Sequence, residues 1–378
     1  MMTGENKIVE EPRWCSNCLT MSTRPRITFD NLGRCNACIW SEKKKTLDWN
    51  DRERQLVKLL DSHRKSDGNF DCLVPLSGGK DGSYVAYNLK HKYGMNPLCV
   101  TITPALPLDL GEKNLRAFVE SSYNHISINP DYETMRILNK IGFEEMGFPY
   151  YGWLISITTA PVRIANQFNI GIIFYGEDGE VEYGGSTETA ANPIYDTEYQ
   201  RKVYLEGGHQ KILDKSGLNR NNLYFFEYPE EIDNPVNQVN LTHWSYFENW
   251  DPYRNYLLAK EHCGLQEAEE SNSGTFTNFS QNDQALYALH TYLMYLKFGF
   301  GRANQDASIE IRRGAMTRDQ AVNLVNLYDG HYPTQYLNQY LEYFQMTKDQ
   351  FDLVIDKYAN KQLFEKKNDA WKPRFKVR

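Results

Sequence analysis

The sequence feature that most constrains the fold is a glycine turn between an apolar run and a helical pattern. It lies in the stretch FDCLVPLSGGKDGSYVAYNLKHKYG. The apolar run Cys72–Leu76 predicts a buried strand, and Ser83–Tyr93 predicts a helix with one apolar face. Gly78 and Gly79 allow a sharp turn and a close approach of the backbone to a ligand. Because a helix N-terminus presents unpaired N–H groups, this arrangement favours an anion, most simply a phosphate.

An ordinary strand-to-helix turn would need neither Lys80 nor Asp81, which follow the two glycines. The pattern matches neither the Walker A loop nor the G-x-G-x-x-G fingerprint. It resembles the PP-loop, S-G-G-x-D-S, of enzymes that split ATP into AMP and pyrophosphate. Gly82 takes the place of the final serine of that motif, and Ser83 follows one residue later. The hydroxyl contact to pyrophosphate is therefore expected from Ser83 or is absent.

The stretch from residue 70 to residue 247 alternates between apolar runs and helical patterns. This alternation predicts an α/β fold with a doubly wound parallel sheet. The expected strands are Cys72–Leu76, Leu98–Thr103, His125–Ile128, Ile170–Tyr175 and Leu241–Phe247, and the expected helices include Ser83–Tyr93, Glu112–Tyr123 and Trp153–Phe168. Ligands of such sheets bind outside the carboxyl ends of the strands. Three segments should therefore converge there: Ser77–Ser83, Thr101–Pro104 and Gly176–Asp178.

Two charged segments are candidate parts of the same site. Glu177 follows a buried strand, where a carboxylate could hold Mg²⁺ or orient a substrate, although a solvated acidic turn would look the same. Further along the chain, Arg302 is expected in a glycine-containing loop that runs between two helices up to a capping box at Thr317 and Gln320. Such a loop can carry charge for solubility alone, but arginine is also the natural clamp for phosphate oxygens.

Four of the seven cysteines are clustered near the N-terminus: Cys15, Cys18, Cys35 and Cys38. Their spacing, C-x2-C, sixteen residues, C-x2-C, is that of a zinc ribbon. Four thiolates also suit an iron–sulfur cluster. A closed four-cysteine site is usually structural, so we expect a metal that staples a small N-terminal module. The remaining cysteines lie in apolar or helical contexts and are expected to be inert core thiols: Cys72, Cys99 and Cys263.

Bulk composition limits the function classes. Of 378 residues, 41% are hydrophobic and 24% charged, as in soluble globular proteins, and no apolar run is long enough to cross a membrane. The polar N-terminus is unlike a signal peptide, so a cytoplasmic location is expected. The net charge of -7 argues against a large nucleic-acid footprint. We expect a four-cysteine module (1–45), a charged helical linker (46–69), an ATP-binding domain (70–265, with an insertion around 186–238) and a helical C-terminal region (266–378).

Taken together, these segments resemble the bacterial N-acetyl sugar amidotransferases, PP-loop enzymes of surface-polysaccharide and nonulosonic-acid pathways. The resemblance rests on the four-cysteine segment and on four strings in the same order: SGGKDGSYVA, GEDGEVEYGG, HWSYFENWDPY and FGFGRANQDASIEIRRG. It covers residues 12–330 and implies the adenine nucleotide alpha-hydrolase-like fold. It also implies the reaction, in which ATP adenylates the carbonyl oxygen of an acetamido group, and ammonia then displaces AMP to give an acetamidino group.

The resemblance assigns roles to individual residues. Lys80, Asp81, Glu177 and Arg302 would be catalytic, with Asp81 and Glu177 holding Mg²⁺. The residues that would bind ATP are Ser77, Gly78, Gly79, Gly82, Ser83 and Thr103, and those that would contact the sugar are Tyr183, Gly184, Asp306 and Arg312. No cysteine lies in a glutaminase setting, so the resemblance implies a separate glutaminase partner, akin to the glutaminase and cyclase-type subunits of histidine biosynthesis.

Two other readings remain open. Several tRNA thiolases also pair a PP-loop with C-x2-C knuckles, but the acidic net charge and the lack of an obvious reactive cysteine beside the loop weigh against sulfur transfer. A non-enzymatic zinc-ribbon module would explain Cys15–Cys38 but would leave Ser77–Ser83 without a purpose.

Overall fold

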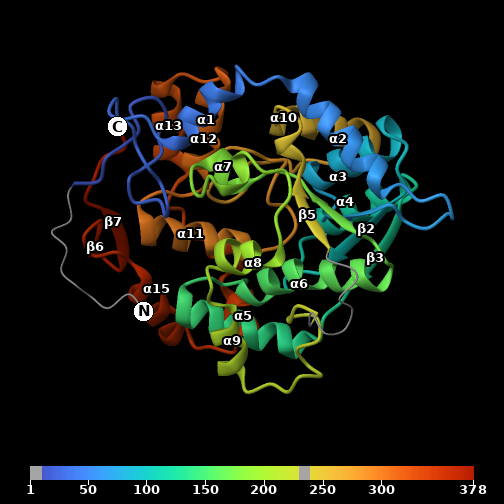
Figure 1. Cartoon of the computed structure of the whole chain (residues 1–378). Coiled ribbons are helices and arrows are strands. Elements are labelled where there is room, and N and C mark those ends of the chain that lie inside the picture. The colour runs from blue at the N-terminus through green and yellow to red at the C-terminus, as the bar shows by residue number, and fades with distance from the viewer. Residues whose placement is uncertain (1–10, 230–238) are drawn as a thin grey trace.

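A five-stranded parallel sheet forms the centre of the chain. The computed structural model describes residues 11–229 and 239–378 (Figure 1). The strand order is β3-β2-β1-β4-β5, and every neighbouring pair is parallel. The strands are β1 (Cys72–Pro75), β2 (Pro97–Ile102), β3 (Asn124–Ile128), β4 (Ile172–Tyr175) and β5 (Asn240–His243). This confirms the predicted α/β class and the parallel sheet. The strand expected at Leu241–Phe247 ends early, because Trp244–Tyr246 turns into a 3₁₀-helix.

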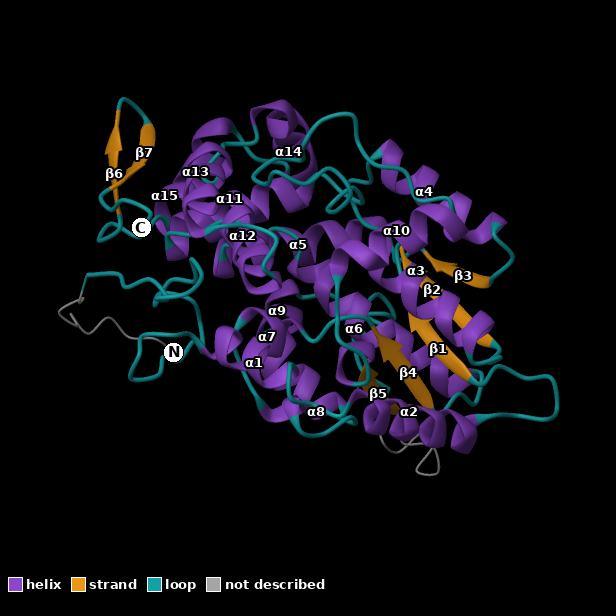
Figure 2. Cartoon of the chain, turned by 90° about the horizontal axis from the view of Figure 1, so that it is seen from above, coloured by secondary structure: helices purple, strands orange, loops and turns teal. Residues whose placement is uncertain are grey.

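Helices cover both faces of the sheet, which is therefore doubly wound, as predicted. Along β1, Cys72 and Val74 pack into one apolar cluster and Leu73 into the other, because successive side chains of a strand point to opposite faces. The first face carries α2 (Trp49–His63), α3 (Lys80–Tyr87, continued by a π-turn at Asn88–Lys92), α4 (Asp109–Glu120) and α10 (Pro252–Cys263). The second carries α5 (Tyr132–Met146), α6 (Tyr151–Gln167, which continues through Pro161) and α9 (His209–Ser216). Figure 2 shows the sheet between these helices.

The strand order creates a switch point between β1 and β4. From β1 the chain proceeds outward through β2 and β3, whereas β4 pairs with the other side of β1 and leads to β5. The loops that leave the two strands therefore diverge, and a crevice opens at their carboxyl ends.

The C-terminal region contains five helices and a hairpin. They are α11 (Leu286–Phe298), α12 (Arg302–Arg313), α13 (Arg318–Tyr328), α14 (Leu337–Phe344) and α15 (Lys348–Tyr358), followed by β6 (Phe364–Lys367) and β7 (Ala370–Pro373). The capping box of Thr317 and Gln320 is present, as predicted. The expectation of a wholly helical tail is wrong, because Asn368 and Asp369 both adopt positive φ and join β6 to β7 in a tight antiparallel turn.

The prediction of a charged loop around Arg302 is also wrong, because Arg302–Arg313 is helical. Gly301 precedes the helix and Gly314, at φ 77°, ends it, so the segment between them contains no helix breaker. Ala303 and Ala307 lie one turn apart and are buried, which gives the helix its packing face.

The remaining short elements lie in the N-terminal module, directly after β4, in the predicted insertion and before α14. They are α1 (Asn36–Lys44), α7 (Gly179–Tyr183) and α8 (Thr197–Tyr199), with single turns at Glu188–Ala190, Gln200–Tyr204 and Thr334–Tyr336. The described part of the insertion packs beside β5, where Tyr195 exchanges two backbone hydrogen bonds with Leu241; its last nine residues lie outside the described chain. Within the described ranges, no helix is long and apolar enough to cross a bilayer.

Candidate functional site

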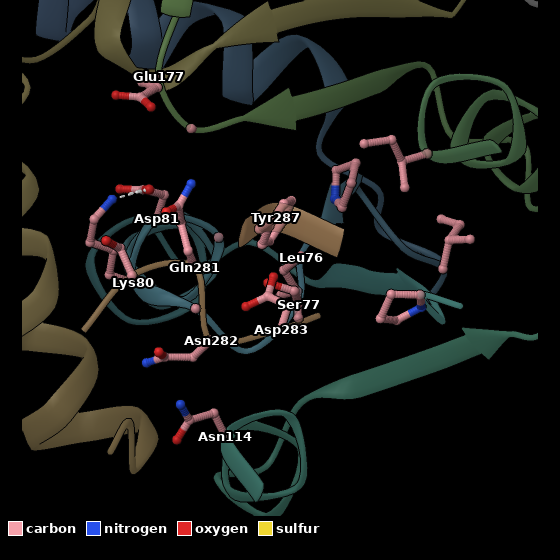
Figure 3. A pocket seen from close by; sticks show the side chains of 18 of the residues that line it. Leu76, Ser77, Lys80, Asp81, Asn114, Glu177, Gln281, Asn282, Asp283 and Tyr287 are labelled. Atoms are coloured by element: carbon pink, nitrogen blue, oxygen red, sulfur yellow. Dashed lines mark hydrogen bonds and ion pairs between the residues drawn. The ribbon is translucent and has the colours of Figure 1, made fainter. Parts of the chain in front are cut away.

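A cavity of about 430 Å³ opens at the switch point, as the strand order requires (Figure 3). Its walls include the segments that leave β1 and β4, together with the carboxyl end of β2. The predicted site residues that line it are Ser77, Gly79, Lys80, Asp81, Gly82, Glu177 and Arg302. Residues that are far apart in the sequence therefore meet in one cavity, as the sequence pattern predicted for the turn and for Glu177.

The glycine turn is fixed by close contacts. Gly78 has φ 80°, and a Cβ there would lie 2.5 Å from the backbone nitrogen of Leu115 in α4. A Cβ at Gly82 would lie 2.4 Å from the Cβ of Leu76, which explains why the serine of the usual motif is absent from this position. Ser83 is fully buried, its hydroxyl has no described partner, and it does not line the cavity.

Lys80 and Asp81 begin α3 and form an ion pair at the cavity wall. Lys80 is buried, whereas the Asp81 side chain keeps 29% of its surface exposed, so the carboxylate remains accessible. The Asn255 amide lies 3.4 Å from the other oxygen of Asp81 and orients it. Asp81 at the first turn of α3 also interacts favourably with the helix dipole.

Glu177 follows β4 and faces the Lys80–Asp81 pair across the cavity. Burial, and next the charge of Asp81, raise the pKa of Glu177. The hydroxyl of Tyr183 donates a hydrogen bond of 2.5 Å to its carboxylate. A neighbouring Mg²⁺ would offset the repulsion between Glu177 and Asp81, so the pair fits a divalent cation with further ligands from a bound phosphate.

Asp178, the neighbour of Glu177, has a different role. Its carboxylate accepts hydrogen bonds from the backbone N–H groups of Glu180 and Val181 and caps α7. The same carboxylate accepts a hydrogen bond from the Thr189 hydroxyl, and the side chain is buried away from the cavity.

Arg302 reaches the cavity from the C-terminal region. Its Nε donates a hydrogen bond of 2.8 Å to Asp306, whose other carboxylate oxygen accepts from Thr275 at 2.6 Å. The N-terminus of α12 is held by Asp329, which accepts from the N–H groups of Gly301 (2.8 Å) and Ala303 (2.9 Å). The guanidinium of Arg302 is therefore held in place by Asp306, and it lies at the N-terminus of α12.

Sequence reasoning missed one wall of the cavity. The segment Phe279–Asp283 lines it, as do Asn114, Tyr150, Trp153 and Tyr287. Gln281 has φ 60°, a left-handed conformation that is costly for a residue other than glycine and is concentrated at functional sites. No motif marked this segment, and only its lack of helical or strand periodicity could have drawn attention to it.

Several predicted site residues do not line the cavity. Gly78 and Ser83 lie behind the turn, and the Thr103 hydroxyl lies beside Ser127 at 3.4 Å. Tyr183 donates a hydrogen bond to Glu177, and Asp306 accepts one from Arg302. Both therefore support cavity residues without lining the cavity themselves. The last two, Gly184 and Arg312, belong to the surroundings of the cysteine module: the Gly184 carbonyl accepts from Arg24 at 2.8 Å, and Arg312 lies beside Cys18.

The four N-terminal cysteines form one buried cluster, as predicted. The sulfur atoms of Cys15 and Cys38 lie 3.7 Å apart and those of Cys18 and Cys35 lie 3.6 Å apart. Four sulfurs bound tetrahedrally at about 2.3 Å from zinc lie about 3.8 Å from one another. The donor set and its spacing therefore fit a structural zinc ion.

Polar groups support the cysteine cluster from outside. The Cys35 N–H donates to the Cys15 sulfur at 3.2 Å, and Arg312 lies 3.6 Å from the Cys18 sulfur. Arg312 also donates to the backbone carbonyl of Glu182 in α7, so it joins the module to the helix that carries Tyr183. N–H groups and a guanidinium next to thiolates are the outer partners that a zinc–thiolate site needs.

The other three cysteines are buried and do not line the cavity: Cys72, Cys99 and Cys263. Burial raises the pKa of each thiol, so none is a ready nucleophile.

Comparison with known proteins finds a similarity in the C-terminal region of the chain. Residues 273–378 match the family model described as the C-terminal domain of LPS biosynthesis protein WbpG-like proteins. This region supplies Arg302, Gln281, Asp283 and Tyr287 to the cavity. The chain is also 29% identical over 89 residues to the uncharacterized protein MJ1599 of Methanocaldococcus jannaschii, which is 23% of this chain and 32% of that protein. The chain thus spans about a third of the length of this relative.

Proposed function

We propose that the protein is an ATP-dependent amidotransferase that converts the acetamido group of an N-acetylated sugar into an acetamidino group and releases AMP and pyrophosphate. The observation that carries the proposal is the convergence of the glycine turn, Lys80, Asp81, Glu177 and Arg302 on one cavity at the switch point. The similarity of residues 273–378 to LPS biosynthesis proteins supports a sugar as the substrate.

The cavity residues fit a nucleoside triphosphate. The turn Ser77–Gly79 and the N-terminus of α3 provide N–H groups for an anion, and Gly79 keeps the backbone free of side-chain atoms. Lys80 and Arg302 would neutralise the phosphate charge, and Asp81 with Glu177 would hold Mg²⁺. When bound, ATP supplies an electrophilic α-phosphorus and a pyrophosphate leaving group.

The reaction balances with ATP and ammonia as the only co-reactants. The acetamido oxygen bonds to the α-phosphorus while the bond to pyrophosphate breaks. The ammonia nitrogen then bonds to the acetamido carbon, the carbon–oxygen bond breaks and its electron pair leaves with AMP, and the attacking nitrogen loses a proton. Lys80 and Arg302 would stabilise the charge that develops on the phosphates, because both are held in place before the reaction begins.

The cysteines bear on the source of the nitrogen. All seven are buried and none lines the cavity, which supports a source of ammonia other than a cysteine nucleophile of this chain. We therefore propose that a separate glutaminase partner delivers ammonia. The same observation weighs against sulfur transfer to RNA, which would need a reactive cysteine at the cavity.

Mass spectrometry can test the proposal without the partner. The protein is incubated with MgATP, ammonium chloride and a panel of acetamido sugars, free and linked to UDP, and Asp81→Asn serves as the control. Replacement of oxygen by NH lowers the mass of the substrate by about one unit, and this product should form only with the unmodified protein. If no sugar in the panel changes mass while AMP accumulates with another acceptor class, the proposed substrate is wrong.

A further inference from the structure

The short helix α7 lies between the four-cysteine module and the cavity. It contains the five residues Gly179–Tyr183 and begins two residues after Glu177. A helix of this length is not stable by itself, so its position depends on what it packs against. Figure 1 shows α7 next to α1, the helix that carries Cys38. The module therefore helps to decide where the C-terminal end of α7 lies.

Glu182 in α7 is bound by the module through three contacts. The Trp40 Nε1 group of α1 donates to one carboxylate oxygen at 2.9 Å, and Lys44 forms an ion pair with the other at 2.7 Å. The side chains of this ion pair are 12% and 13% exposed, so solvent screens it less than a surface pair. Arg312, which lies beside Cys18, donates to the Glu182 carbonyl at 3.1 Å.

The turn that follows α7 packs directly against the module. Gly184 has φ 87°, and a Cβ there would lie 2.6 Å from Ile27 and 2.8 Å from the side-chain oxygen of Asn36. The Asn36 amide donates to the Gly185 carbonyl at 3.0 Å, and Arg24 donates to the Gly184 carbonyl at 2.8 Å. The contact leaves no room for a side chain at Gly184, so the end of α7 follows the position of the module.

Tyr183 is the last residue of α7 and connects the two sites. The Arg24 guanidinium lies 5.8 Å from the centre of the Tyr183 ring, within the range of a cation–π contact. At the other end of the side chain, the hydroxyl donates the 2.5 Å hydrogen bond to Glu177. Because the ring is held from the module side, the hydroxyl fixes the orientation of the Glu177 carboxylate.

The module itself depends on its cysteines. Its buried core consists of the four cysteines and Ala37, with three partly buried apolar side chains packed around them. Segments with so small a core rarely fold without a metal or disulfides, because metal binding supplies much of the folding free energy. The places of Arg24 and α1 therefore depend on the cysteine cluster, although the cluster itself does not line the cavity.

We propose that the four-cysteine module positions the Glu177 carboxylate for its divalent cation, with Tyr183 as the positioning residue between them. The inference rests on the proposed function, in which Glu177 and Asp81 hold Mg²⁺. The Tyr183 hydroxyl occupies one oxygen of the Glu177 carboxylate and leaves the other for the cation. The N-terminal module would thus be part of the machinery of the cavity as well as a structural staple.

The test measures binding of an ATP analogue with a methylene group between the α- and β-phosphates. Calorimetric titrations of the full chain are made once with MnCl₂ and once without a divalent cation. Tyr183→Phe keeps the ring beside Arg24 but removes the hydroxyl. We expect it to weaken binding in Mn²⁺ by about 10–100-fold, the usual effect of removing an outer partner of a metal ligand, and to leave binding without the cation unchanged. In a Glu177→Gln background, Tyr183→Phe should cost nothing further.

A second variant tests the link to the module. Glu182→Ala removes the contacts of Trp40 and Lys44 with α7 but alters no cysteine and no cavity residue. We expect one zinc per chain, as in the unmodified protein, and a loss of Mn²⁺-dependent affinity smaller than that of Tyr183→Phe, because the contacts of Arg24 and Arg312 remain. Glu188→Gln is the matched control, since it breaks an exposed ion pair with Lys202 beyond α7, and it should bind like the unmodified protein.

The outcomes separate this inference from the proposed function. If the unmodified protein binds the analogue with Mn²⁺ and either Tyr183→Phe or Glu182→Ala binds it equally well, the inference is wrong and the ATP site stands. Weakening of the same size with and without Mn²⁺ would show a general loss of structure and would also overturn the inference. If the unmodified protein does not bind the analogue under either condition, the ATP site is wrong and the inference falls with it.

Discussion

Gly78 and Gly79 are adjacent in the turn, yet the structure predicts opposite effects of replacing each with alanine. At Gly78 the backbone is left-handed, and the added Cβ would lie within 2.7 Å of three backbone atoms of Asn114 and Leu115. Backbone atoms inside a helix cannot move aside cheaply. We expect about 1–2 kcal/mol from the left-handed φ and about 1–3 kcal/mol from overpacking, or about 2–5 kcal/mol in all.

Gly79→Ala is the matched control. Its φ is -75°, and the nearest atom to the added Cβ is the Ser77 hydroxyl at 3.4 Å, so the methyl group fits. The loss of glycine flexibility in the unfolded chain should then stabilise the protein by about 0.4–1 kcal/mol.

Thermal unfolding followed by circular dichroism separates the two variants. An unfolding entropy of about 2.1 cal/mol/K per residue over 378 residues converts the cost at Gly78 into a fall in melting temperature of about 3–6 °C. Gly79→Ala should melt at or slightly above the temperature of the unmodified protein. Equal melting temperatures of the two variants would refute the argument that α4 closes on the turn at Gly78.

Further predictions concern Arg302, Asp329 and Cys15. Arg302→Ala should lower turnover by about 10²–10³-fold, because it removes a charged clamp that acts on developing charge. It should also lower the melting temperature, since Asp306 is left buried without its cation. Arg302→Lys should recover more of the melting temperature than of the turnover, and a full recovery of steady-state turnover would show that a point charge suffices. Burial raises the pKa of Asp329 from 3.8 to about 7. Between these two pH values the folded state holds a proton that the unfolded state has lost, so the free energy of unfolding falls as the pH rises through this window. Calorimetric melts of Asp329→Asn should therefore depend less on pH across the window than those of the unmodified protein, and identical pH dependence would contradict the shift. Elemental analysis should find one zinc per chain, and Cys15→Ser should lose both the metal and stability; a metal-free protein purified under reducing conditions would contradict the zinc site.

The fold could be predicted from the sequence wherever the local residue pattern directly reflects the place of a segment in the folded chain. Short apolar runs bounded by turns predicted the five strands within a few residues, because strands buried on both faces consist of continuous apolar residues. The four cysteines were predictable for a similar reason, since the chemistry of the metal dictates their spacing. The flanking glycines of Arg302–Arg313 favour a loop, and the side chains of the i, i+4 pair Ala303 and Ala307 are too small to give the strong apolar signal of a helix.

The site was predictable only in part, because its residues come from segments with different sequence signals. The turn around Lys80 and Asp81 carries a motif, and Glu177 follows a recognisable strand. Asp283 and Gln281 carry no motif, and their position depends on the contact of the Phe279–Asp283 segment with Gly111 in α4. That contact is tertiary and cannot be read from either segment alone. The same holds for Arg312, whose place beside Cys18 depends on how α12 packs against the cysteine module.

The proposed reaction requires the acetamido oxygen of the sugar to bond to the α-phosphorus of ATP. The most direct test uses a sugar whose acetamido oxygen is ¹⁸O, incubated with MgATP and ammonium chloride, and follows the label by mass spectrometry of the nucleotide products. We expect the label in the phosphate of AMP, no label in pyrophosphate, and no transfer with Asp81→Asn. Label in orthophosphate, with ADP as the nucleotide product, would contradict the proposed reaction.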